Sequence, residues 1–219
     1  MRPKRIILIR HGESEGNVDE NVYSNKPDYK LDLTSKGLEQ AEKCGINLRE
    51  ITKNESCFFY VSPLFRTRQT YKQIVKSYTK DLYETQEEPR VREQEWGHLK
   101  DVQTCDNINL ARDEYGVFYY RIPDGESAAD VYDRVSDFYG TLHRDFEKEN
   151  FRDNCIVVTH GMTIRLFLMK WFHWTVEEFE NLKNPENCDV IVLEKSKDGK
   201  YKLLTEMKKN DKNFKHFEY

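Results

Sequence analysis

Long apolar segments and paired cysteine motifs are both missing from this chain of 219 residues. No apolar run approaches the roughly 18 residues that indicate a membrane span, and the apolar stretch after residues 1–5 is too short for a secretory signal. The five cysteines are odd in number and scattered, with no Cys-x-x-Cys pair. This usage is typical of reduced thiols and not of a disulfide framework. We therefore expect a cytoplasmic protein that does not insert into membranes.

An excess of charge of one sign is missing as well. Lys and Arg number 35 against 39 Asp and Glu, for a net charge of −4 that is spread along the sequence. Proteins that bind nucleic acids or anionic membranes usually carry a clustered basic surface. The charge balance therefore argues against a nucleic-acid partner, and the sequence makes no prediction of oligomeric state.

Size and composition favour one domain that spans residues 1–219. Apolar residues make up 37% of the chain and charged residues 34%. A chain of this length buries enough apolar surface to fold without a disulfide or a structural metal.

Short unbroken apolar runs alternate with helical patterns along most of the chain. The runs, at residues 5–10, 58–61, 156–158 and 190–193, have the character of buried parallel strands. The helical patterns lie at residues 34–48, 67–78, 128–146 and 164–171. Alternation of this kind predicts an α/β fold, a three-layer αβα sandwich with a mostly parallel central sheet.

Two segments depart from the alternation. Residues 97–126 mix polar residues with the aromatic cluster Phe118–Tyr120, and we interpret them as an insertion over the sheet edge that could form a lid. Beyond a hairpin signal at Asp198-Gly199, the chain becomes charged and loses its apolar period. We expect a loosely packed polar tail from about residue 206.

Three of the predicted strands end in residues that could form one site. They continue as RHGESEGN at 10–17, SPLFRTRQT at 62–70 and THGMTIR at 159–165. Because the carboxyl ends of parallel strands lie on one side of a sheet, two histidines and at least two arginines should converge there. Such a cationic site, rich in hydrogen-bond donors, suits a tetrahedral oxyanion such as phosphate.

Taken singly, each of these strings has an ordinary structural interpretation. Arg-His-Gly after a strand is usually a solvated loop, Thr-His-Gly can cap a backbone carbonyl, and Ser-Pro-Leu can open a helix. All three occur in order, each at the end of a buried strand, and this combination favours a functional site.

The same strings resemble the signature of the histidine phosphatase superfamily, in the branch that contains cofactor-dependent phosphoglycerate mutases. The likeness rests on LIRHGES at 8–14 with Asn17, LTSKGLEQA at 33–41, residues 62–70, GES at 125–127 and THG at 159–161. It covers the chain from about residue 5 to 194 and implies the phosphoglycerate mutase-like fold. The stretches 92–97, 118–121 and 125–132 are similar to a eukaryotic subgroup of phosphoglycerate-mutase-like proteins of plants and fungi.

The resemblance implies a role for each matching residue. His11 would be the nucleophile that becomes phosphohistidine, and Glu93 would be the proton donor. The phosphoryl oxygens would be bound by Arg10, Asn17, Arg66, His160 and Gly161. Glu95 lies in the same turn as Glu93 and competes with it for the donor role.

Elementary chemistry is compatible with these roles. A nucleophilic histidine must be neutral, and nearby arginines disfavour its charged form. The same arginines stabilise a phosphoryl group in flight, so we expect neither a metal ion nor a cofactor. The predicted function is a metal-independent phosphomonoester hydrolase, a histidine acid-base phosphatase acting on a small phosphorylated substrate.

Two alternatives stay open at this point. A cofactor-dependent phosphoglycerate mutase would resemble its family further, with a lysine where this chain has Thr104 and an Arg-Arg pair where the nearest basic residues are Arg112 and Arg121. A non-catalytic binder of phosphorylated ligands would not need a proton donor at Glu93. Contact of the leaving group with Trp96, Tyr119, Tyr120 or Arg121 is a further hypothesis, but the sequence favours aromatic residues that pack in the interior.

Overall fold

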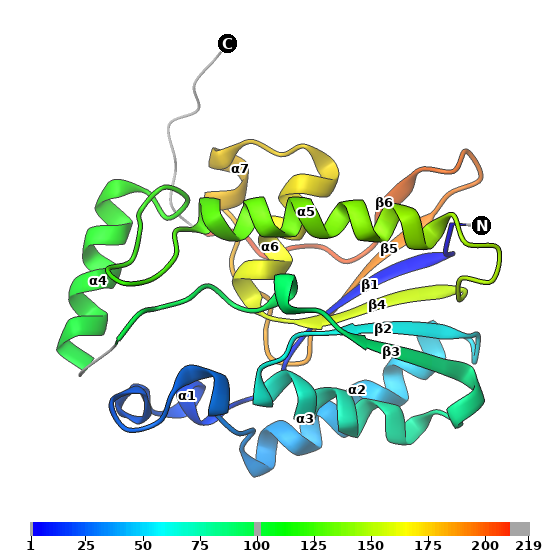
Figure 1. Cartoon of the computed structure of the whole chain (residues 1–219), viewed down its shortest axis with the longest axis horizontal. Coiled ribbons are helices and arrows are strands. Elements are labelled where there is room, and N and C mark those ends of the chain that lie inside the picture. Colours follow the sequence, from blue (N-terminus) through cyan, green and yellow to red (C-terminus); the bar gives the residue numbers. More distant parts are fainter. Residues whose placement is uncertain (1, 99–101, 211–219) are drawn as a thin grey trace.

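The protein forms a layered α/β structure around one six-stranded sheet (Figure 1). The computed structural model describes residues 2–98 and 102–210. The strands follow the order β3-β2-β4-β1-β5-β6 across the sheet. Their bounds are β1 Arg5–Arg10, β2 Cys57–Val61, β3 Tyr83–Glu87, β4 Asn154–Thr159, β5 Val190–Lys195 and β6 Tyr201–Leu203.

Helices cover both faces of the sheet. The α-helices are α1 Glu15–Val18, α2 Ser35–Ile51, α3 Phe65–Ile74, α4 Val102–Tyr115, α5 Ala128–Phe146, α6 Gly161–Phe172 and α7 Val176–Glu180. Short 3-10 turns are η1 Glu20–Ser24, η2 Asp28–Lys30, η3 Val75–Ser77, η4 Lys80–Leu82 and η5 Pro89–Val91. Helices α2 and α3 lie on one face and α5 and α6 on the other (Figure 1). The predicted αβα sandwich is confirmed.

Alternate strand residues supply the two halves of the core. In β1, Ile6 and Leu8 pack with α5 and α6, whereas Ile7 and Ile9 pack with α2 and α3. Both faces of a central strand are therefore buried, because successive side chains point to opposite sides of the sheet. This burial explains why the strands appear in the sequence as unbroken apolar runs.

The direction of β5 corrects the sequence prediction. The apolar run at residues 190–193 predicts a buried parallel strand, but β5 pairs with β1 in the antiparallel direction. After α6 and α7 the chain crosses back to the end of the sheet where His11 lies, and Cys188 N donates to the His11 carbonyl at 3.3 Å. The strand that follows must therefore run away from that end. Burial alone does not encode strand direction.

The edge strand β3 is a feature that the sequence pattern did not reveal. It pairs in parallel with β2 along its whole length, yet four of its five residues are exposed. Its polar sequence, YETQE, carries no apolar period, so only its pairing with a neighbour identifies it as a strand.

The segments that departed from the alternation have defined neighbours. Within residues 97–126 the structure contains α4, which stands beyond the carboxyl ends of the strands on the same side as α1 (Figure 1). Of the predicted tail, Lys208 and Asn210 hydrogen-bond to residues 181–183. Residues 99–101 of the insertion and 211–219 of the tail lie outside the described residues.

Among the described helices, none combines the length and the apolar character needed to cross a membrane. All five cysteines are free thiols.

Candidate active site

His11 and His160 face one another where β1 and β4 end. Their ring centroids are 5.1 Å apart with an interplanar angle of 60°. The exposed fraction is 4% for His11 and zero for His160. Adjacent parallel strands end side by side, with Arg10 paired to Thr159 in register, so the residue that follows each strand arrives at the same place.

The hydrogen bonds of His11 define its tautomer. Its Nδ1 lies 2.8 Å from the Gly12 carbonyl oxygen. Because a carbonyl oxygen can only accept, Nδ1 must carry the proton. The lone pair of the neutral ring is then on Nε2. The loop is held from outside by Asn187, whose Nδ2 donates to the His11 carbonyl at 3.0 Å.

Two buried nitrogen atoms beside His11 have no hydrogen-bond partner within residues 2–98 and 102–210. One is Nδ1 of His160, whose Nε2 is 2.8 Å from the Ser62 hydroxyl. The other is Nε of Arg10, whose Nη1 donates to the Pro185 carbonyl at 2.6 Å. Buried polar atoms are almost always hydrogen-bonded, so these atoms indicate a place for a ligand that accepts hydrogen bonds.

The electrostatics keep both histidines neutral. Burial lowers the pKa of His11 well below its ordinary value, and the charges of Arg66 and Arg10 lower it further. Burial also lowers the pKa of His160, with Arg66 as the next cause. A nearby cation and a poorly solvating interior both disfavour the imidazolium.

Arg66 is the second residue of α3 and is 4% exposed. Its Nη1 and Nη2 donate to the two carboxylate oxygens of Asp28 at 2.9 and 3.2 Å. Its Nη1 also donates to the backbone carbonyl of Asp28 at 2.9 Å. A carboxylate therefore occupies donors of the guanidinium that the sequence predicted would bind phosphate.

The Glu93 carboxylate lies beside the N-terminus of α6. Its Oε2 is 3.4 Å from the amide nitrogen of Met162, and its Oε1 is 3.4 Å from the Thr163 hydroxyl. The backbone is fixed by Arg134 on α5, which donates to the carbonyls of residues 90, 92 and 93. The Glu93 carboxylate is thus held at Met162 and Thr163, the second and third residues of α6.

Glu95 has different surroundings. It is exposed, and its backbone pairs with Glu126, with 3.0 Å between the Glu95 amide and Glu126 Oε2. Its pKa is raised, chiefly by partial desolvation and then by the negative charges of Asp28 and Glu126. Of the two candidates for proton donor, only Glu93 contacts the helix that begins after His160.

The two other predicted phosphate ligands lie at helix starts. Asn17 is in the short helix α1, and its Oδ1 accepts from Ser14 N at 3.1 Å and from Asn187 Nδ2 at 3.1 Å. Because Oδ1 is the acceptor in these contacts, the side-chain nitrogen of Asn17 is the atom that can donate to a phosphoryl oxygen. Gly161 opens the 12-residue helix α6, and a Cβ there would come within 2.9 Å of Asn184 Cγ. Unpaired amides at such a helix start favour an anion.

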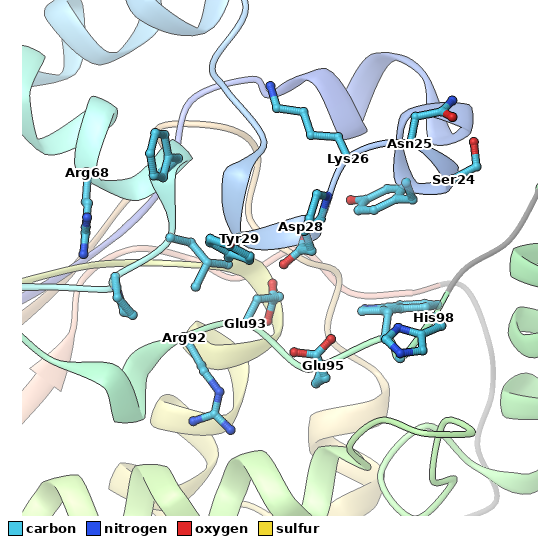
Figure 2. A pocket seen from close by; sticks show the side chains of 17 residues that line it. Ser24, Asn25, Lys26, Asp28, Tyr29, Arg68, Arg92, Glu93, Glu95 and His98 are labelled. Carbon is cyan, nitrogen blue, oxygen red and sulfur yellow. The ribbon is translucent and has the colours of Figure 1, made fainter.

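A cavity of about 860 Å³ opens beside this cluster (Figure 2). Its walls come from residues 23–29, the start of α3, and residues 92–98. Figure 2 shows Asp28, Glu93 and Glu95 pointing toward one another inside it. Asp28 connects the cavity to Arg66, and Glu93 connects it to α6. The cavity is large enough for a small organic group, since ligand pockets usually measure about 300–1,000 Å³.

The residues proposed to contact a leaving group do not share one location. Trp96 lines the cavity. Tyr120 lines a smaller hollow of about 250 Å³ on the other side of Trp96. Tyr119 is 60% exposed, and Arg121 pairs with Asp130 at 2.6 Å.

The basic residues of the insertion also separate. Arg112 on α4 is buried, donates to Gln94 Oε1 at 3.1 Å, and lies over the Trp96 ring at 5.1 Å from its centroid. Arg121 is at the surface. Thr104 lies on α4 beside the smaller hollow. The structure therefore does not bring Arg112 and Arg121 together as an adjacent basic pair.

Sequence reasoning missed several polar neighbours of the histidines. Ser62 begins the string at residues 62–70 and has no role in the sequence prediction, although its position directly after a strand is a usable signal. Asp28 belongs to the 3-10 turn η2 and Asn187 to the loop before β5, and neither is part of a sequence motif. Only the tertiary structure brings them to Arg66 and His11. No group of three or more potential metal ligands occurs in the described part of the chain.

Comparisons with known proteins identify the family of the chain. Residues 6–207 match the family model of the histidine phosphatase superfamily, branch 1. The chain is 44% identical to the phosphoglycerate mutase-like protein AT74 of Arabidopsis thaliana, over 92% of this chain and 68% of the relative. It is 31% identical to the broad-range acid phosphatase DET1 of Saccharomyces cerevisiae, over 88% of this chain and 86% of the relative.

The fold has solved counterparts. A mycobacterial glucosyl-3-phosphoglycerate phosphatase, solved in complex with VO3, aligns with a TM-score of 0.74 at 20% identity, covering 94% of this chain and 99% of that one. At this identity the likeness concerns the fold alone. The match to the family model over most of the chain, together with these relatives, shows that the chain belongs to the histidine phosphatase superfamily.

Proposed function

We propose that this member of the histidine phosphatase superfamily hydrolyses phosphomonoesters through a phosphohistidine formed on His11. The observation that carries the proposal is the pair of buried, neutral histidines, with His11 Nδ1 held by the Gly12 carbonyl. A histidine fixed in this tautomer presents the lone pair of Nε2 as a nucleophile.

In the first step, Nε2 of His11 attacks the phosphorus atom. A P–N bond forms while the P–O bond of the ester breaks. Glu93, entering as a carboxylic acid, gives its proton to the departing oxygen, so that an alcohol leaves instead of an alkoxide. The negative charge on the phosphoryl oxygens is met by Arg10, Arg66 and His160, with Asn17 and the start of α6 as further donors.

In the second step, water replaces the leaving group. Glu93, now a carboxylate, takes a proton from the water, whose oxygen attacks the phosphorus atom. The P–N bond breaks, inorganic phosphate leaves, and both His11 and Glu93 return to their starting states. Electrostatic stabilisation by the arginines supplies what a divalent cation supplies in other phosphoryl-transfer enzymes.

The relatives support hydrolysis as the outcome. DET1 of Saccharomyces cerevisiae is a broad-range acid phosphatase, whereas the more similar plant proteins are named only as phosphoglycerate mutase-like. The charge on the cavity wall, considered below, also disfavours a bisphosphate held for return transfer.

The test is hydrolysis of p-nitrophenyl phosphate by the wild type and by His11→Ala. We expect the variant to lose at least about 10³-fold in kcat. His143→Ala is the matched control, since His143 is exposed on α5, and it should keep wild-type activity. Rapid quenching with a ³²P-labelled ester should trap an acid-labile phosphoenzyme in the wild type alone. A wild type no more active than His11→Ala would favour a non-catalytic binder, and an active enzyme without the labelled intermediate would exclude the phosphohistidine route.

A further inference from the structure

Among the described residues, the wall of the large cavity carries His98 and three lysine or arginine side chains, and each of these three is paired with an acid outside the cavity lining. Lys26 lies 2.6 Å from both Glu15 and Asp32. Arg68 is 2.5 Å from Glu87. Arg92 is 2.8 Å from Glu126. None of these four acids belongs to the lining of the cavity. The charges of these lysine and arginine side chains are therefore already neutralised by acids that lie outside the cavity lining.

The acidic side chains of the same wall are placed differently. Glu93 and Glu95 have no ion-pair partner within residues 2–98 and 102–210, and both point into the space (Figure 2). Asp28 completes the group and is paired with Arg66. A phosphoryl group that takes over donors of Arg66 would release the Asp28 carboxylate toward the cavity as well.

Acidic side chains therefore gather in the cavity beside the proposed phosphate site, and Glu95 supplies negative charge there when Glu93 enters as a carboxylic acid. Desolvation is the main cause of the raised pKa of Glu95, and the negative charges of Asp28 and Glu126 raise it further. Glu95 would repel an anionic leaving group. A cationic leaving group would be attracted to Glu95 and would reduce the repulsion between the carboxylates.

Aromatic rings complete the surface. Tyr23, Tyr29, Phe65 and Trp96 all line the cavity. Ring faces attract cations and exclude water from the methylene groups of a small ligand. Carboxylates combined with aromatic faces are the usual protein environment for an ammonium group.

We infer that the leaving group of the natural substrate is a cationic alcohol, an amino alcohol esterified to phosphate, and that Glu95 is the residue that selects it. The inference rests on the proposed phosphatase activity and adds to it the chemical class of the substrate. The same repulsion would disfavour phosphoglycerates, whose leaving groups carry a carboxylate.

The test uses three monoesters of equal length that differ in terminal charge: 2-aminoethyl phosphate, 2-hydroxyethyl phosphate and 2-phosphoglycolate. Their kcat/KM values are measured for the wild type, Glu95→Gln and Glu95→Lys, with p-nitrophenyl phosphate as a reference. Glu39→Gln, an exposed change on α2, is the matched control. Comparing each ratio between variants cancels the intrinsic reactivity of the three alcohols.

We expect the ratio of the ammonium ester to the carboxylate ester to fall by about tenfold in Glu95→Gln, to fall further in Glu95→Lys, and to stay at the wild-type value in Glu39→Gln. Rates on the p-nitrophenyl and hydroxyl esters are measured in every variant, so that a change in the ratio is separated from a general loss of activity. The shift should shrink at high salt, because a partly exposed charge pair is screened.

An unchanged ratio in Glu95→Gln would overturn the inference while leaving the phosphatase intact. So would turnover of p-nitrophenyl phosphate without measurable turnover of the ammonium ester. Equal loss on all three alkyl esters, with p-nitrophenyl phosphate spared, would instead make Glu95 the proton donor and also refute the selectivity role. Failure of the wild type on every substrate, p-nitrophenyl phosphate included, would refute the phosphatase activity itself.

Discussion

Asp28 and Arg66 form a two-point ion pair in which Nη1 and Nη2 of the arginine meet the two carboxylate oxygens at 2.9 and 3.2 Å. The Arg66 side chain is 5% exposed and that of Asp28 29%. The carboxylate comes from η2, far in sequence from α3. In the proposed mechanism the same guanidinium binds the phosphoryl group, so substrate and Asp28 compete for its donors.

Removing the charge of Asp28 should therefore tighten phosphate binding. In Asp28→Asn the amide keeps one acceptor for Arg66 but no longer neutralises it. We expect the inhibition constant of inorganic phosphate to fall by about fivefold, equivalent to about 1 kcal/mol. Asp133→Asn, an exposed change on α5, should have no effect. Weaker phosphate binding in Asp28→Asn would mean that Asp28 acts by orienting Arg66 and not by competing for it.

Glu93→Gln should separate the leaving-group proton from the rest of the chemistry. An alkyl phosphate needs a proton on its departing oxygen, whereas p-nitrophenolate leaves without one. We expect kcat on 2-hydroxyethyl phosphate to fall by about 10²–10⁴-fold and kcat on p-nitrophenyl phosphate to fall much less. Equal losses on both esters would exclude Glu93 as the proton donor.

Ser62 is predicted to set the tautomer of His160. Its hydroxyl is 2.8 Å from His160 Nε2, and both residues are fully buried. If Ser62 donates to Nε2, the proton sits on Nδ1, the atom that lacks a partner among the described residues and can donate to a phosphoryl oxygen. Ser62→Ala should lower kcat/KM by about tenfold.

The tautomer itself can be observed by ¹⁵N NMR of the His160 ring. Nδ1 should be protonated in the wild type, and Ser62→Ala should give a mixture of the two tautomers. An exposed serine at the start of α2 offers the control variant Ser35→Ala. A protonated Nε2 in the wild type would contradict the assignment.

The stability of the fold should depend on pH through His11 and His160. Both have a pKa well below the ordinary 6.5 in the folded state, because of burial and the nearby Arg66. Below pH 6.5 the unfolded chain binds protons that the folded chain does not, so the free energy of unfolding falls as the pH falls. Each histidine contributes a loss of about 1.4 kcal/mol per pH unit until its folded pKa is reached.

Urea unfolding of the wild type and of His160→Asn between about pH 7 and pH 5 measures this slope. The free energy of unfolding of His160→Asn should fall less steeply with decreasing pH than that of the wild type. The difference in slope should correspond to about one bound proton. His143→Asn, a change at an exposed histidine, should keep the wild-type slope. An equal slope in the wild type and His160→Asn would show that His160 is not held neutral in the fold.

Much of the site was predictable because its residues follow strands. His11, Arg66 and His160 stand just after β1, β2 and β4, and unbroken apolar runs identify buried strands in a sequence. A parallel sheet then delivers the residues after those strands to one edge. The charged edge strand β3 and the antiparallel β5 were not predictable in this way, because neither pairing nor direction leaves an apolar period.

The sequence by itself determined which chemical groups would gather at the strand ends, since the apolar periods and the motifs are local properties. Only the tertiary structure decided their partners, which are Asp28 on Arg66, Ser62 on His160 and Asn187 on His11, and it placed Glu95 in the cavity wall. Such contacts join residues 38–176 positions apart. They depend on how loops cross the end of the sheet, a matter of packing and hydrogen-bond satisfaction that no local pattern encodes.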